Sequence, residues 1–312
     1  MKALPGAAVF APWHEHNGLE AGTEMILMTT TQTQTTARED RITGGAGLNI
    51  LVRSWRPAGI PRAVVVICHG VKSHSGYYGW TAEQLVGEGL TVYALDLHGR
   101  GKSDGDRFYL EKFQDYLDDV HATMTMAKSR EPGLPVFLLG HSAGGVVSSV
   151  YTLEHQADLK GFICESFAFQ VYAPDFALAV LKGLSHLAPH AHVLNLKTED
   201  FSRDPEAVQA MLDDPLIAHE VQPTRTVAQL VLADERLKRE FPLITLPVLI
   251  LHGTADKVTK PAGSQLFFDT AGSKDKTLKL YDGHFHDLLN DIDKEKVISD
   301  IKQWINAHVS AN

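Results

Sequence analysis

Residues 135–145 read PVFLLGHSAGG, in which a short apolar run leads directly into a serine flanked by glycines. The run has the composition of a buried strand, and the residues that follow have the pattern of a helix. A serine on such a sharp turn needs small residues two positions before and after it, because neighbouring backbone passes close by. Gly140 and Gly144 meet this requirement. The stretch therefore predicts that Ser142 is a nucleophile at a helix N-terminus, whose free N–H groups face the reacting centre.

The same alternation of apolar runs and amphipathic segments continues on both sides of this stretch. Strands are expected at 63–68, 90–95, 135–139, 159–164, 246–251 and 278–281. Helices are expected at 76–88, 112–129, 143–156 and 294–309. Continuous apolar strands separated by helices indicate an α/β fold, with a mostly parallel sheet covered on both faces. Ligands of such sheets bind beyond the carboxyl ends of the strands.

Residues 168–240 interrupt the alternation, because they contain no apolar strand run and begin with a helical pattern at 174–188. We expect this block to be a helical cap. It would be inserted between the two parts of an α/β core, which comprise residues 38–167 and 241–312.

Residues 1–37 differ from the rest of the chain, because they include the polar run TTTQTQTT at 29–36. This composition predicts a flexible leader. The first alternating pattern typical of a folded domain begins at residue 48. Translation is therefore hypothesised to begin naturally at Met25 or Met28.

Composition excludes several classes of protein. The chain has 312 residues, a formal net charge of −9 and 44% hydrophobic residues, which is ample material for a core. Two cysteines exclude a disulfide scaffold, and the acidic balance argues against a nucleic-acid partner. The longest apolar stretch, at 171–196, is broken by prolines, charges and histidines, so no transmembrane helix is expected. The expected location is the cytoplasm.

The sequence offers an acid and a base for Ser142. A serine hydroxyl becomes reactive when a base takes its proton and an acid orients that base. Asp256 follows the strand at 246–251, and Glu165, at the end of GFICE, is an alternative acid one strand earlier. After the last strand, YDGHFH supplies two candidate bases, His284 and His286, which point in different directions.

Backbone donors for an oxyanion are expected at two places. The strand at 63–68 ends in His69, Gly70 and Val71, and an HG pair after this strand marks a loop that donates one N–H to the oxyanion. The other donor is the residue after the nucleophile. These positions assign the backbone N–H groups of Val71 and Ala143.

Several segments together resemble the α/β-hydrolases of the monoacylglycerol lipase and lysophospholipase group, which are also described as serine aminopeptidase-like. The segments are HGVKSHSGYY at 69–78, DLHGRGKSDG at 96–105, PGLPVFLLGHSAGG at 132–145, LHGTAD at 251–256 and KTLKLYDGHFH at 276–286. The resemblance spans residues 48–308. It implies a triad of Ser142, Asp256 and His286, and it requires no metal or organic cofactor.

This sequence departs from the group at two positions. Many members have a second glycine where Lys72 stands and a methionine where Ala143 stands. Both backbone donors are kept despite these changes. The side chains at these positions change the shape and polarity of the pocket, so the substrate of the group does not carry over directly.

The substrate expected from the resemblance is a small acyl ester, such as a monoacylglycerol or a lysophospholipid. The first cap helix carries apolar residues at helical spacing, which are Phe176, Ala177, Val180, Leu181, Leu184 and Leu187, and of these Phe176, Val180 and Leu184 are the candidate substrate contacts. They would either pack the cap on the core or form an acyl-chain wall and touch lipid surfaces. His69 and Gly70 are further candidate contacts. Alternative functions are a serine aminopeptidase, a thioesterase or acyltransferase with the same triad, and a non-catalytic receptor.

Overall fold

The computed structural model describes residues 36–172 and 175–310. Within these residues an eight-stranded sheet has the order β1-β2-β4-β3-β5-β6-β9-β10. The strands are β1 Arg38–Thr43, β2 Asn49–Trp55, β3 Ala63–Cys68, β4 Leu90–Leu95, β5 Val136–His141, β6 Gly161–Glu165, β9 Val248–Gly253 and β10 Lys276–Tyr281. β1 and β2 are antiparallel to their neighbours, and the strands from β4 to β10 in this order are parallel.

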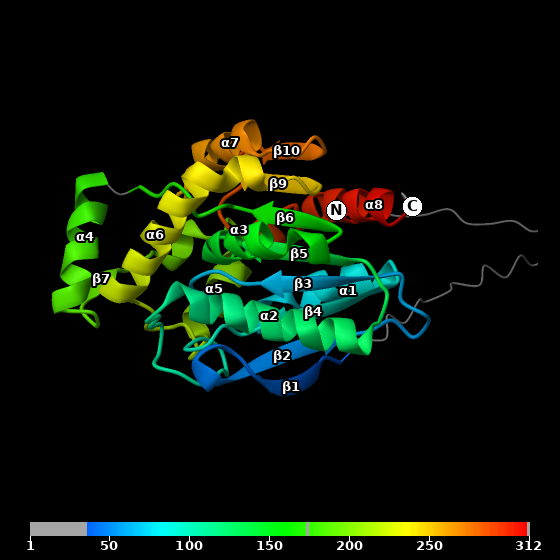
Figure 1. Cartoon of the computed structure of the whole chain (residues 1–312), viewed down its shortest axis with the longest axis horizontal. Coiled ribbons are helices and arrows are strands. Elements are labelled where there is room, and N and C mark those ends of the chain that lie inside the picture. Colours follow the sequence, from blue (N-terminus) through cyan, green and yellow to red (C-terminus); the bar gives the residue numbers. More distant parts are fainter. Residues whose placement is uncertain (1–35, 173–174, 311–312) are drawn as a thin grey trace, which may run out of the picture. The chain divides into compact units, whose positions relative to one another are not determined.

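Helices cover both faces of the sheet (Figure 1). They are α1 Gly79–Gly87, α2 Phe113–Arg130, α3 Ala143–His155, α7 Pro261–Thr270 and α8 Lys294–Ser310. Alternate residues of β3 enter different cores: Val64 and Val66 pack with α2, α3 and α7, while Val65 and Ile67 pack with α1 and α8. A strand buried on both faces has no polar side to display, which is why these strands are continuous apolar runs in the sequence.

The chain between β6 and β9 adds α4 Asp175–Leu187, α5 Pro205–Asp213 and α6 Thr224–Glu240, with the short strands β7 His192–Leu194 and β8 Gln222–Pro223. α4 and α6 lie beyond the carboxyl ends of the central strands in Figure 1. This arrangement places the segment above the edge of the sheet where ligands of parallel sheets bind.

The predicted strands and helices are present, with ends displaced by a few residues. The predicted helix at 76–88 is a 3-10 turn, Ser75–Tyr78, followed by α1. β1 was not predicted, because its sequence REDRIT carries charges on most positions and is largely exposed. The leader and the hypothesised starts, Met25 and Met28, lie outside the described residues. Within the described segments, every helix is too short or too polar to cross a membrane.

Candidate active site

Ser142 occupies the sharp turn between β5 and α3, with φ 56° and ψ −121°. A non-glycine residue at positive φ is strained, and it persists only where the surroundings hold it. Here closely packed backbone on both sides of the turn holds Ser142 in this conformation. A Cβ on Gly140 would lie 2.6 Å from Gly144 O, and a Cβ on Gly144 would lie 2.3 Å from the carbonyl oxygens of Cys68 and His69. The two glycines predicted to frame the serine are therefore required by backbone contacts.

The structure brings Ser142, His286 and Asp256 into one hydrogen-bonded row. His286 Nε2 lies 2.8 Å from Ser142 Oγ, and His286 Nδ1 lies 2.8 Å from Asp256 Oδ2. Ser142 follows β5, Asp256 lies beyond β9, and His286 lies beyond β10. All three are buried. The geometry is that of a nucleophile, a base and an orienting acid.

Asp256 is held by more groups than the sequence indicates. Its Oδ1 accepts hydrogen bonds from the backbone N–H groups of Val258 and Thr259, at 2.7 and 2.9 Å. Its Oδ2 also accepts one from Thr259 Oγ1 at 2.9 Å and lies 3.0 Å from His252 Nε2. Burial by itself would raise the pKa of Asp256, but the nearby His286 and a hydrogen bond from His252 lower it well below the ordinary value. The carboxylate is thus kept ionised beside the base.

His252 and Thr259 were missed in the sequence analysis. His252 Nδ1 lies 2.7 Å from Ser264 Oγ at the start of α7. The signal was present in the LHGTAD segment, where His252 stands four residues before the predicted acid. Sequence spacing does not reveal that both residues face the same carboxylate.

The two alternative residues are placed elsewhere. Glu165 is fully buried at the end of β6, and its carboxyl forms no hydrogen bond with His286 among the described residues. Burial, and then the charge of Asp287, raise the pKa of Glu165 well above its ordinary value. His284 Nδ1 lies 3.8 Å from Asp291 Oδ2 rather than near the serine. The geometry favours Asp256 and His286 over these alternatives.

The loop after β3 borders the serine. A Cβ on Gly70 would lie 2.7 Å from Ser142 Cβ, so only glycine fits there without a shift. Among the described residues, neither the Val71 nor the Ala143 backbone N–H donates a hydrogen bond, and both residues line the same cavity as Ser142. The two predicted oxyanion donors are thus unoccupied by protein acceptors.

The same loop is tied to the segment between β6 and β9. Glu220 accepts a hydrogen bond from Lys72 N at 2.8 Å and pairs with the buried Arg100. Gln222 donates to Glu220 at 2.6 Å and accepts from Arg100 at 2.8 Å. Lys72 adopts φ 49°, which glycine adopts more easily. The backbone of Lys72 is therefore held at positive φ by a buried ionic network.

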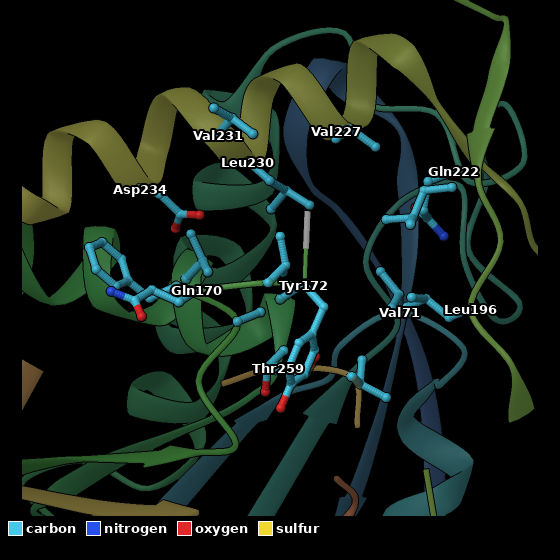
Figure 2. A pocket seen from close by; sticks show the side chains of 18 of the residues that line it. Val71, Gln170, Tyr172, Leu196, Gln222, Val227, Leu230, Val231, Asp234 and Thr259 are labelled. Atoms are coloured by element: carbon cyan, nitrogen blue, oxygen red, sulfur yellow. The ribbon is translucent and has the colours of Figure 1, made fainter. Parts of the chain in front are cut away.

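A cavity of about 890 Å³ opens beside Ser142. Val71 and Leu196 lie on one side of it, and Val227, Leu230 and Val231 project into it from α6 (Figure 2). These linings make most of the cavity apolar. Its size is that of a site for a small organic ligand.

The residues predicted to contact substrate are placed differently. Val180 and Leu184 are 64% and 36% exposed, and the members of the predicted stripe that line the cavity are Ala177 and Leu181. His69 faces inward, where its Nε2 accepts a hydrogen bond from Leu97 N at 3.1 Å. The side chain of Phe176 lies outside the described residues.

Three buried side chains are spaced closely enough to hold a metal ion. The potential ligand atoms of His141, Glu165 and Asp287 lie within 4.8 Å of one another. Burial raises the pKa of Asp287 to about 6, and its carboxylate already accepts hydrogen bonds from Asn290 at 3.1 Å. The pKa of Glu165 is raised further, so that carboxyl favours its protonated form, which is a poor metal ligand. The expectation that no metal is needed stays a prediction.

Comparison with known proteins identifies the family. A family model described as serine aminopeptidase, S33, matches residues 59–293. The chain belongs to this family. It is therefore an α/β-hydrolase, and the predicted fold class is confirmed.

Similar proteins match most of the chain. A monoacylglycerol lipase from Mycolicibacterium smegmatis is 33% identical, covering 88% of this chain and 99% of the relative. The monoglyceride lipase of Homo sapiens is 32% identical, covering 83% and 88%. The crystal structure of a monoacylglycerol lipase from Paleococcus ferrophilus has 31% identity and a TM-score of 0.75, covering 82% and 99%. These relatives confirm the resemblance that the motifs carried.

Proposed function

We propose that the chain is a serine carboxylester hydrolase in which Ser142, His286 and Asp256 form the catalytic triad. The row of two 2.8 Å hydrogen bonds at the edge of the cavity carries the proposal. Ser142 Oγ attacks the acyl carbonyl while His286 Nε2 takes its proton. Asp256 accepts the Nδ1–H hydrogen bond, which orients the ring and stabilises the imidazolium.

The backbone N–H groups of Val71 and Ala143 bind the oxyanion of the tetrahedral intermediate. Losing one such donor typically costs about 3 kcal/mol of transition-state stabilisation. The alcohol leaves with the proton held by His286, and an acyl-enzyme on Ser142 remains. Water then gives its proton to His286 and attacks the acyl carbonyl, which releases the acid and restores the serine hydroxyl.

The proposed substrates are monoacylglycerols, lysophospholipids or similar small acyl esters. The mostly apolar cavity beside the serine suits an acyl chain. Relatives named monoacylglycerol lipase, monoglyceride lipase and phospholipase support this substrate class. The aminopeptidase, and the thioesterase or acyltransferase, are the alternatives that the same triad would serve.

We also propose that residues 168–240 act as a cap over a core formed by 38–167 and 241–312. Leu187 of α4 is 86% exposed and Val180 is 64% exposed, which supports transient contact between this cap and a lipid surface. Sedimentation with phosphatidylcholine vesicles tests that contact, and Leu187→Ser should weaken it. Binding that is unchanged in the variant would refute it.

The proposed location is the cytoplasm, where the buried free thiols of Cys68 and Cys164 would stay reduced. Cell fractionation tests this location.

Fatty-acid release from monoacylglycerols, lysophospholipids and short-chain esters tests the proposed function. Ser142→Ala should abolish turnover, while Ser299→Ala, an exposed serine of α8, should leave it unchanged. Both variants should retain the circular dichroism spectrum of the parent. Turnover of aminoacyl amides or thioesters, but not of oxygen esters, would instead support an alternative.

A further inference from the structure

The cavity beside Ser142 changes character along α6. Val227 and Leu230 face the cavity, and Asp234 follows on the same face of the helix, seven residues or about 10 Å beyond Val227. Figure 2 shows the Asp234 carboxyl projecting toward the cavity above Gln170, on the side away from Val71. One end of the apolar cavity is therefore polar, and the proposed ester chemistry does not use that end.

The Asp234 carboxyl has no protein partner at this end. Its side chain is partly exposed, but Oδ1 is sealed from solvent and has no hydrogen bond within the described residues. Burial, and then the charge of Glu235, raise the pKa of Asp234 well above its ordinary value. The favoured form is the neutral acid, which both donates and accepts hydrogen bonds. A buried polar group without a partner is costly, so it requires an explanation.

Gln170 supplies a second polar group to this end of the cavity. Its backbone oxygen accepts a hydrogen bond from Lys260 N at 2.8 Å, which holds the segment after β6 that carries Gln170. Its side-chain amide lines the cavity and is partly exposed. The partly exposed ion pair between Lys182 and Glu235 lies at the same end and marks its boundary with solvent.

We propose that Asp234 and Gln170 form a subsite for a hydroxyl group carried on the acyl chain, remote from the ester carbonyl. This inference rests on the proposed function, since it specifies the acyl group that the same cavity accepts. A hydroxyl both donates and accepts, as do a neutral carboxyl and an amide, so the three groups can satisfy one another. An unsubstituted chain leaves Asp234 Oδ1 unpaired, and a site built for a hydroxyl discriminates against the analogue that lacks it.

The experiment compares monoacylglycerols that carry a hydroxyl near the carboxyl end, at mid-chain or at the terminal carbon with the same chains lacking it. The readout is the ratio of kcat/KM for each hydroxylated ester to that for its plain counterpart. The parent should prefer one remote position by about 3- to 10-fold, the worth of one net hydrogen bond. Asp234→Leu should bring that ratio to one, whereas Asp234→Asn, which keeps a donor and an acceptor, should largely preserve it.

Arg239→Leu is the matched control, because Arg239 is an exposed residue of α6 that does not line the cavity. This variant should keep the ratio of the parent. Hydrolysis of plain and hydroxylated esters with a ratio of one at every position would overturn the subsite, and so would an unchanged ratio in Asp234→Leu. Absence of hydrolysis of any ester would instead contradict the proposed function, so the two failures are distinguishable.

Discussion

Gly144 and Gly145 are adjacent in sequence but differ in what surrounds them, and this difference predicts opposite effects of one methyl group. A Cβ on Gly144 would lie 2.3 Å from the carbonyl oxygens of Cys68 and His69, where ordinary contact begins at 3.4 Å. Both obstacles are backbone, so the β3 end and the turn must separate by about 1 Å. A Cβ on Gly145 would meet Cys164 Sγ and the Phe167 ring at 3.3 Å, which small adjustments relieve.

The displaced backbone leads directly to Val71, the proposed oxyanion donor. Donors act at about 2.7–3.1 Å from the oxyanion, so a shift of about 1 Å removes one of them and should lower kcat of Gly144→Ala by about 100- to 1,000-fold. Overpacking should also lower the free energy of unfolding by about 1–3 kcal/mol. Gly145→Ala should keep kcat within about threefold, because its methyl group needs only a slight adjustment.

Ester hydrolysis under saturating substrate and urea unfolding measure the two quantities separately. A Gly144→Ala protein that is folded and retains kcat within threefold of the parent would refute the reasoning. Equal losses in Gly144→Ala and Gly145→Ala would also refute it, because the backbone contacts that distinguish them would then be irrelevant.

Three further predictions concern the acidic residues. Asp256→Asn should lower kcat by about 10⁴-fold, because the amide favours the wrong imidazole tautomer; a fall below tenfold in ester hydrolysis would contradict its role. Glu165→Gln should gain stability relative to the parent as pH rises from about 4.5. The folded parent keeps a proton on Glu165 that its unfolded chain releases. The free energy of unfolding of the parent therefore falls by about 1.4 kcal/mol per pH unit up to the raised pKa. Free energies of unfolding from urea titrations that change equally with pH in the two proteins would contradict this. Glu220→Ala should lower the free energy of unfolding by about 3–5 kcal/mol, because the buried Arg100 loses its counter-charge. Glu220→Ala should also reduce kcat, because it frees Lys72 N in the loop that carries Val71. Glu220→Gln should lose less stability and less kcat than Glu220→Ala. Equal losses of kcat in the two variants would show that the Lys72 contact is unimportant.

The sequence predicts the core of the fold well for a physical reason. Strands buried on both faces must be apolar throughout, so β3, β5 and β9 are visible as runs. β1 has one exposed face and many charges, so it resembles a loop. The steric requirements of the serine turn likewise restrict Gly140 and Gly144 to small residues, which makes the nucleophile recognisable.

The parts that escaped prediction depend on contacts between distant residues or on the rotation of a helix. Glu220 meets Lys72 across 148 positions, and no local pattern indicates that pairing. On α4, Val180 and Leu184 form one apolar stripe, while Ala177 and Leu181 form another beside it. Helical spacing does not distinguish two adjacent stripes, and the structure selects the second for the cavity.

The Glu220–Lys72 contact has a consequence for chimeras within this family. Exchanging the 168–240 segment between relatives is an attractive way to transfer acyl-chain preference. Here, however, that segment also anchors the loop that carries Val71, through a carboxylate whose partners, Lys72 and Arg100, belong to the recipient scaffold. A donor segment without a carboxylate at this place would import a new pocket and at the same time loosen the catalytic loop. Transplants should therefore be selected first for this junction and only then for the shape of their pocket.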